Sequence, residues 1–146
     1  MSADIVIRAA TAEDENLVIG LWRVCGLTAS YNDPAQDYRL ALGKGNSEIL
    51  LGVDASNHIV GSIMVGHDGH RGWIYYVAVD PAQQGLGTGR RMVSAAEHWL
   101  EERNIVKVML LVRETNTKVV EFYNRIGFEA IPRVVMQKWL IEPSQS

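Results

Sequence analysis

The sequence predicts a mixed α/β domain built around one sheet. Its length of 146 residues suits one domain rather than two. Hydrophobic residues make up 47% and charged residues 21%, as in ordinary globular proteins. Strand-like and helix-like segments alternate along the chain, without an internal repeat or a linker. We therefore expect residues 1–146 to form a single domain with about seven strands and about four helices.

The first half of the chain predicts a strand, two helices and a meander of three strands. Residues 5–8 alternate in polarity, as in a strand. Thr11 is followed by two acids, which favour a helix start because they face the positive end of the helix dipole. The apolar stripe of this helix is Leu17, Val18, Leu21, Trp22 and Cys25. A second helix follows from residue 32, and the meander strands are expected at residues 48–53, 59–65 and 73–79, with the hairpin signal Asp68-Gly69 before the last of them.

The second half predicts a crossover followed by closing elements. A helix is expected over about residues 87–103, and the apolar run at residues 107–112 indicates a strand buried on both faces. The strands on either side of this helix should be parallel. The remaining predicted elements are a helix at residues 117–125 and short strands near Phe128 and at residues 134–140.

Composition argues against several classes of protein, namely nucleic-acid binders, membrane proteins and exported proteins. There are 14 Lys and Arg against 17 Asp and Glu, a net charge of −3, which argues against a nucleic-acid binder. The longest apolar runs fall far short of the ~18 residues of a membrane span. The acidic start lacks the apolar region of a signal peptide. With Cys25 as its one cysteine, the chain forms no internal disulfide, and we expect a cytoplasmic protein.

The most informative segment joins the strand at residues 73–79 to the next helix. Gly85, Gly87 and Gly89 alternate there, and glycines allow several N–H groups to converge on one point. The helix start adds unpaired N–H groups and a positive dipole end, which suits a phosphate. The alternative is a glycine-rich connection without a ligand. Arg90 stands where a dinucleotide fingerprint needs its last glycine, and Gly89-Arg90-Arg91 is no P-loop ending, so NAD and nucleoside triphosphates are disfavoured.

Two motifs resemble those of a known family. Gln84-x-x-Gly87-x-Gly89, directly after a strand, resembles the acetyl-CoA motif of the GNAT family of N-acetyltransferases. Its second signature is matched by Asn116, Tyr123 and Gly127-Phe128. The order of elements agrees over nearly the whole chain, and short segments such as Asn32-Asp33-Pro34 are similar to the YpeA-like bacterial acetyltransferases.

The resemblance implies a mixed, mostly antiparallel sheet that splays between its fourth and fifth strands, with acetyl-CoA in the gap as acyl donor. The backbone of Val77 and Val79 would pair with the pantetheine arm, and Asn116 would hold the donor from the opposite side. Tyr123 would be the general acid. The diphosphate would lie on the N–H groups of Gln84, Gly85, Leu86, Gly87, Thr88 and Gly89, beside Arg90.

The reaction implied is aminolysis of a thioester. An alkyl amine of pKa about 10.4 must lose a proton before it attacks. A backbone N–H such as that of Val77 could stabilise the oxyanion, and Tyr123 can protonate the departing thiolate. The structural alternative for Tyr123 is a ring packed beside Phe128 in the core.

The sequence departs from the family at the general base. Leu111 stands where some relatives have a glutamate, and Tyr75 and Tyr76 occupy the other usual place. The substitutes are Asp68, His70, Glu114 or a water chain that ends on a tyrosine hydroxyl. His67, Asp68 and His70 do not make up the ligand set of a zinc site, so no metal is predicted. Acceptor specificity is expected at residues 67–71 and around Tyr31, Asn32, Asp33 and Tyr38.

We predict an acetyl-CoA-dependent N-acetyltransferase that acetylates a primary amine by direct attack in a ternary complex. The acceptor is a small molecule or a peptide end. The alternative is a non-catalytic acyl-CoA-binding module or sensor, and a dinucleotide oxidoreductase ranks far behind both. Exposed strand edges are compatible with a homodimer.

Overall fold

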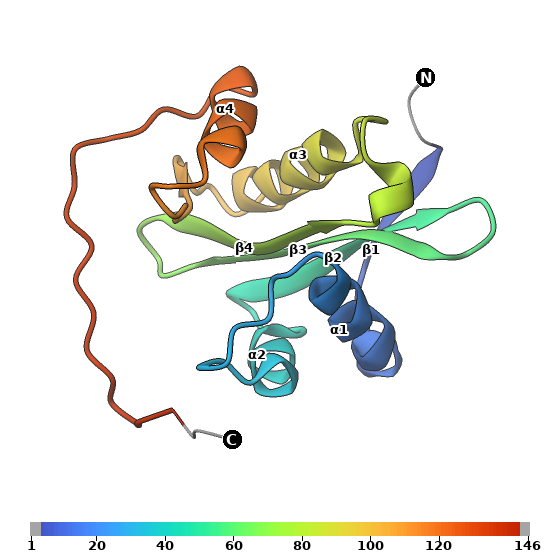
Figure 1. Ribbon diagram of the computed structural model, residues 1–146, viewed down its shortest axis with the longest axis horizontal. Helices are drawn as coiled ribbons and strands as arrows, with labels where there is room; N and C mark the ends of the chain where they lie inside the picture. The colour runs from blue at the N-terminus through green and yellow to red at the C-terminus, as the bar shows by residue number, and fades with distance from the viewer. Residues whose placement is uncertain (1–3, 144–146) are drawn as a thin grey trace. The chain divides into compact units, whose positions relative to one another are not determined.

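A five-stranded mixed sheet organises the first part of the chain (Figure 1). In this computed structural model residues 4–143 are described. The chain divides into two compact units, residues 1–110 and 111–146, which we describe separately. The strands lie in chain order: β1 (Ile5–Ala9), β2 (Ser47–Asp54), β3 (Ile59–His67), β4 (Gly72–Val79) and β5 (Val108–Met109). The first four strands are antiparallel, and β5 runs parallel to β4, so the predicted crossover is confirmed.

Helices cover both faces of this sheet (Figure 1). The 3-10 turn η1 (Ala12–Asp14) leads into α1 (Glu15–Val24), and α2 (Pro34–Ala41) follows on the same face. The turn η2 (Pro81–Gln83) leads into α3 (Thr88–Glu101), which covers the opposite face. The second unit contains α4 (Thr117–Arg125). The four α-helices of residues 4–143 agree with the sequence prediction.

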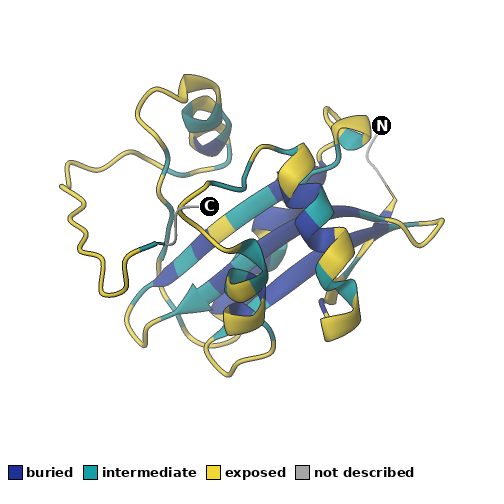
Figure 2. Ribbon diagram, turned by 60° about the horizontal axis from the view of Figure 1, so that its bottom comes forward, coloured by how far each residue is buried: buried dark blue, intermediate teal, exposed yellow. Residues whose placement is uncertain are grey.

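The core lies on the two faces of the central strands (Figure 2). Trp22 and Tyr38 are fully buried on the side of α1 and α2. On the other side α3 packs so closely that a Cβ at Gly61 would lie 3.1 Å from Met92 and 3.2 Å from the Thr88 methyl group. Because Gly61 has no side chain, the start of α3 is held directly against β3.

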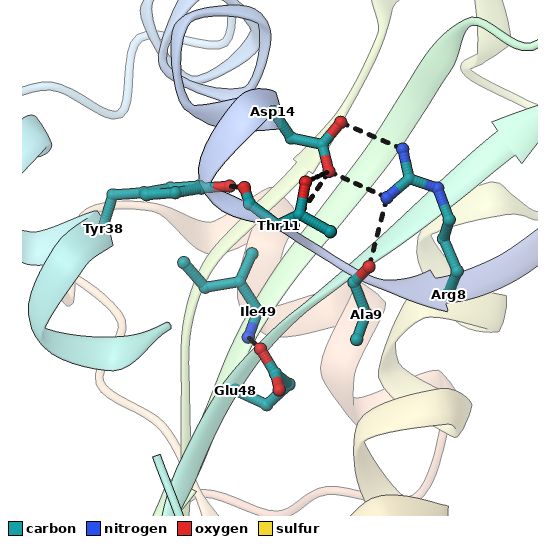
Figure 3. A network of polar contacts seen from close by, with 7 residues as sticks. All are labelled: Arg8, Ala9, Thr11, Asp14, Tyr38, Glu48 and Ile49. Carbon is teal, nitrogen blue, oxygen red and sulfur yellow. Dashed lines mark hydrogen bonds and ion pairs between the residues drawn. The ribbon is translucent and has the colours of Figure 1, made fainter. Parts of the chain in front are cut away.

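A polar network fixes the start of α1 against β1 and α2 (Figure 3). The Asp14 carboxylate accepts hydrogen bonds from the Thr11 N–H at 2.9 Å and from both terminal nitrogens of Arg8 at 2.8 and 3.0 Å. The Tyr38 hydroxyl donates to the Thr11 carbonyl. The predicted helix start at Thr11 is therefore confirmed, with Asp14 as the residue that closes the first turn.

We expect Asp14→Asn to lower the free energy of unfolding at neutral pH by about 1–2 kcal/mol. The Arg8 guanidinium lowers the pKa of Asp14 from 3.8 to about 2. A carboxyl whose pKa is depressed by folding stabilises the protein above its unfolded pKa, and this contribution is lost as the pH falls from about 4 to about 2. Denaturant titrations of both proteins at neutral and at acid pH test this. A stability gap of equal size at both pH values would contradict it.

The prediction of about seven strands is wrong, because residues 4–143 contain five. The predicted strand at residues 107–112 is reduced to Val108–Met109, and Leu111 is exposed rather than buried. No strand forms near Phe128 or at residues 134–140. Val134, Met136 and Leu140 are 88–91% exposed there, so no sheet covers them. Apolar and β-branched residues form a strand only where a neighbouring strand supplies hydrogen bonds and a packing surface.

Candidate active site

A bulge interrupts β4 at Tyr76 and Val77. The register pairs Tyr75 with Met64 and Ala78 with Ser62, so two residues of β4 oppose one residue of β3. Tyr76 adopts a φ of 50°, a left-handed conformation that residues with side chains rarely take. Bulges re-aim the backbone and are frequent beside active sites. This one lies at the residues for which the sequence predicts contact with the thioester.

Buried polar groups hold the bulge from the side of α1. The Trp22 indole N–H donates to Ser62 Oγ at 3.0 Å, and Ser62 Oγ donates to the Tyr76 carbonyl at 3.4 Å. The Trp22 ring also stacks on the Tyr76 ring with centroids 4.0 Å apart. Trp22 and Ser62 are both fully buried. An unpaired indole N–H in the core would cost free energy, so the bond with Trp22 fixes the position of Ser62 Oγ. Ser62 in turn orients the Tyr76 carbonyl.

Beyond this point β4 has an open edge. Its ladder with β5 joins Gly72 to Val108 and Trp73 to Met109 and goes no further among residues 4–143. Val77 and Val79, the predicted pantetheine-binding residues, lie past the end of that ladder. The Val79 carbonyl accepts a hydrogen bond from the Cys25 thiol at 3.2 Å. A thiol is a weak donor, so it competes little with an amide.

The glycine loop after β4 presents unpaired amides. Gly85 and Gly87 have φ of 83° and 80°, so both need the freedom of glycine. In this loop and the first turn of α3, the N–H groups of Gly85, Gly87, Thr88, Gly89 and Arg90 find no acceptor among residues 4–143. Two of the predicted donors instead make long hydrogen bonds within turns. The Gln84 N–H donates to the Pro81 carbonyl at 3.4 Å, and the Leu86 N–H donates to the Gln83 carbonyl at 3.3 Å.

Side chains at the start of α3 also suit an anion. Thr88 is 1% exposed, and its hydroxyl has no hydrogen-bond partner in the described part of the chain. A buried hydroxyl without a partner indicates a ligand atom or water that completes the site. The first turn of α3 contains no acid, and Arg90 is exposed beside the loop. Arg91 instead donates to the Ile5 carbonyl at 3.0 Å, which gives it a structural role.

The second unit carries the other two predicted site residues. Asn116 is the N-cap of α4, and its exposed side chain makes no capping hydrogen bond. Tyr123 is the buried residue of α4, and its ring meets those of Phe122 and Phe128 edge-on at 5.0 and 5.2 Å. Burial raises the pKa of Tyr123 to about 12, so the phenol stays protonated at neutral pH.

Three of the predicted substitute bases, Asp68, His70 and Glu114, have the following surroundings. The Asp68 carboxylate accepts from the backbone N–H groups of His70 and Arg71 at 2.9 and 2.7 Å, and these bonds lower its pKa. Asp68 therefore shapes the hairpin loop. His70 and Glu114 are exposed. Across residues 4–143 no three His, Cys, Asp or Glu side chains gather closely enough to hold a metal ion, and every helix is too short or too polar to cross a bilayer.

Sequence reasoning missed one polar pair beside the bulge and misplaced one tyrosine. The Tyr76 hydroxyl donates to Asp37 Oδ2 of α2 at 2.7 Å. The two residues lie 39 positions apart, so no local spacing could have joined them. Tyr38, predicted to contact the acceptor, is fully buried and bonded to Thr11. Its neighbour on α2, Asp37, is partly exposed and accepts the hydrogen bond from Tyr76.

Comparison with known proteins assigns the chain to a family. A sequence model described as the acetyltransferase (GNAT) family matches residues 11–128. The chain belongs to the acetyltransferase (GNAT) family. It is therefore an N-acetyltransferase, and enzymes of this family use acetyl-CoA.

Sequence relatives are also acetyltransferases, and solved structures share the fold. An acetyltransferase of Pectobacterium atrosepticum is 36% identical over 136 residues, which cover 93% of this chain and 96% of the relative. One from Yersinia enterocolitica is 36% identical over 135 residues, covering 92% and 95%. Among solved structures, a GNAT acetyltransferase of Staphylococcus aureus has a TM-score of 0.78 at 17% identity, covering 88% and 87%. AAC(6')-Iy, in complex with a bisubstrate analogue of CoA, has a TM-score of 0.78 at 15% identity, covering 95% and 100%.

Proposed function

We propose that this chain transfers the acetyl group of acetyl-CoA to a primary amine by direct attack in a ternary complex. The observation that carries the proposal is the cluster of five unpaired N–H groups around the buried Thr88 hydroxyl, directly after the open edge of β4. Such a cluster fits a diphosphate, and an extended pantetheine arm fits an open strand edge. Residues 1–146 then act as one domain, since the family match runs across the boundary between the two compact units.

Each site residue has a defined task in this proposal. The N–H groups of Gly85, Gly87, Thr88 and Gly89 bind the diphosphate, with Arg90 as an additional cation and Gln84 and Leu86 at the entry of the loop. Val77 and Val79 pair with the pantetheine arm, and Asn116 binds the donor from the second unit. The bulge at Tyr76 orients the Val77 N–H toward the thioester carbonyl, where it stabilises the oxyanion.

The proton transfers of the reaction define a role for Tyr123. The ammonium first loses one proton to solvent or a base, the neutral amine then forms the C–N bond, and the nitrogen loses a second proton before the amide is released. The C–S bond then breaks, and the CoA thiolate takes up one proton. Tyr123 donates that proton, and solvent restores it to the phenol. With Cys25 as its one cysteine, the enzyme suits a reducing cytoplasm, and a homodimer remains our expectation.

Release of free CoA thiol from acetyl-CoA in the presence of a panel of primary amines tests the proposal. We expect release that depends on both substrates and a product that contains the acetylated amine. Intersecting lines in initial-rate plots, with no acetylated protein isolated in the absence of amine, would support direct attack. A covalent acetyl-enzyme that forms without amine and decays when amine is added would contradict it.

The alternative function is a non-catalytic acyl-CoA-binding module. It is favoured by one observation, namely that Leu111, Tyr75 and Tyr76 stand at the usual places of the base, while the Asp68 carboxylate is bonded to the backbone of its own loop. Calorimetry that detects acetyl-CoA binding, together with no thiol release from any amine, would select this alternative and exclude the proposed reaction.

A further inference from the structure

Asp37 is a negatively charged residue that lacks a cationic partner. It lies in the first turns of α2 and is partly exposed. The basic residue of the same helix, Arg39, is engaged elsewhere, with Glu15 at 2.8 and 2.9 Å. In the described part of the chain no Lys, Arg or His forms an ion pair with Asp37. Its carboxylate instead accepts a hydrogen bond from the Tyr76 hydroxyl, which is neutral.

This carboxylate is fixed beside the centre of the proposed site. Tyr76 is the bulged residue of β4, and its neighbour Val77 is the residue assigned to the thioester carbonyl. The Tyr76 ring is stacked on Trp22, and its hydroxyl also has the Asn32 side chain as a hydrogen-bonding neighbour. Burial, followed by the contact with Asp37, raises the pKa of Tyr76, so its hydroxyl remains a proton donor to the carboxylate.

A carboxylate offers about four acceptor positions, and Tyr76 occupies one of them on Oδ2. The others remain for a ligand that supplies N–H donors. Most acceptor amines are cations at neutral pH, and a charge-assisted hydrogen bond to a carboxylate is stronger than a neutral one. The net charge of −3 further favours the approach of cations.

We propose that Asp37 determines acceptor specificity by binding a cationic nitrogen of the acceptor, in a position fixed by Tyr76 and Trp22. The inference rests on the proposed function and adds to it the class of acceptor, a cationic amine. Asp37 binds the acceptor and takes no part in the transfer of the acetyl group. The structural alternative is that Asp37 only complements the dipole of α2 and anchors Tyr76.

The test compares Asp37→Asn with the wild-type enzyme. Asn has the same shape and still accepts from Tyr76, but it lacks the charge. We expect the KM for the fastest cationic amine of the panel to rise on the order of 10- to 100-fold, with little change in kcat or in the KM for acetyl-CoA. Two isomeric acceptors give a second readout. In Asp37→Asn, activity with benzylamine, a cation at neutral pH, should fall. Any activity with 4-methylaniline, which is neutral, should stay at the wild-type level.

Two further variants separate charge from structure. Tyr76→Phe keeps the stacked ring and the Asp37 carboxylate, so it should retain a preference for the cationic acceptor. Asp4→Asn removes an exposed charge outside the site and should behave as wild type. An unchanged KM for the cationic amine in Asp37→Asn, or equal losses with both isomers, would overturn the inference while the proposed function stands. A wild-type protein that acetylates no amine would instead overturn the proposed function.

Discussion

Tyr123→Phe is expected to lower kcat on the order of 100-fold and to leave the affinity for CoA nearly unchanged. The substitution removes the hydroxyl and keeps the ring that meets Phe122 and Phe128. If Tyr123 protonates the CoA thiolate, the loss falls on the chemical step. Initial rates at saturating acetyl-CoA give kcat, and calorimetry with CoA gives the affinity.

Tyr38→Phe is the matched control for this prediction. Tyr38 is also a buried tyrosine, and burial likewise raises its pKa to about 12, but it belongs to the first unit and its hydroxyl bonds the Thr11 carbonyl. Its replacement should lower stability by about 1 kcal/mol and leave kcat unchanged. Parallel losses of kcat and CoA affinity in Tyr123→Phe would assign that tyrosine a structural role only.

The double substitution Gly85→Ala and Gly87→Ala is expected to weaken CoA binding on the order of 100-fold. Both glycines have left-handed backbones, and nothing lies within 4 Å of a Cβ added at either one. Steric space is therefore not the obstacle. Alanine disfavours the left-handed conformation by about 1–2 kcal/mol per residue, so the loop should relax and its N–H groups should no longer converge. Calorimetric titration with CoA measures the change.

Gly26→Ala together with Gly43→Ala provides the matched control. These glycines have φ of 71° and 61°, also with nothing within 4 Å of an added Cβ, and they lie at the ends of α1 and α2. The two double variants should lose similar amounts of thermal stability, but only the first should lose CoA affinity. Equal affinities in both would mean that the loop amides do not bind the diphosphate.

The sequence predicted the elements whose signals are local. The capped start at Thr11, the meander with its turn at Asp68-Gly69 and the helix of residues 117–125 all appear in the structure. The errors lie where a strand depends on its partner. Residues 134–140 have the composition of a strand but form none, and the ladder of β5 with β4 ends at Met109. Propensity describes how a residue fits a sheet and does not supply the neighbouring strand.

In the candidate site, too, features that depend on neighbouring residues could be predicted, and features that depend on distant contacts could not. The glycine loop could be predicted because its function depends on consecutive residues and on backbone geometry that glycine alone allows readily. The left-handed backbone of Tyr76 could not be predicted, because tyrosine rarely adopts that conformation. The contact between Tyr76 and Asp37 could not be predicted either, because the two residues lie far apart in the chain. Packing of Trp22 and Ser62 against Tyr76 produces both features.

The placement of helices on opposite faces of the sheet has an evolutionary consequence. In the proposed function the loop into α3 binds the donor, the carboxylate proposed for the acceptor is on α2, and β4 contributes to both. Mutations in the segment from Gly26 to Asn46 can therefore alter the acceptor specificity without changing the residues proposed to bind acetyl-CoA. On this proposal, new acceptor ranges can arise by exchange of α2 and its flanking loops, with the proposed donor site unchanged.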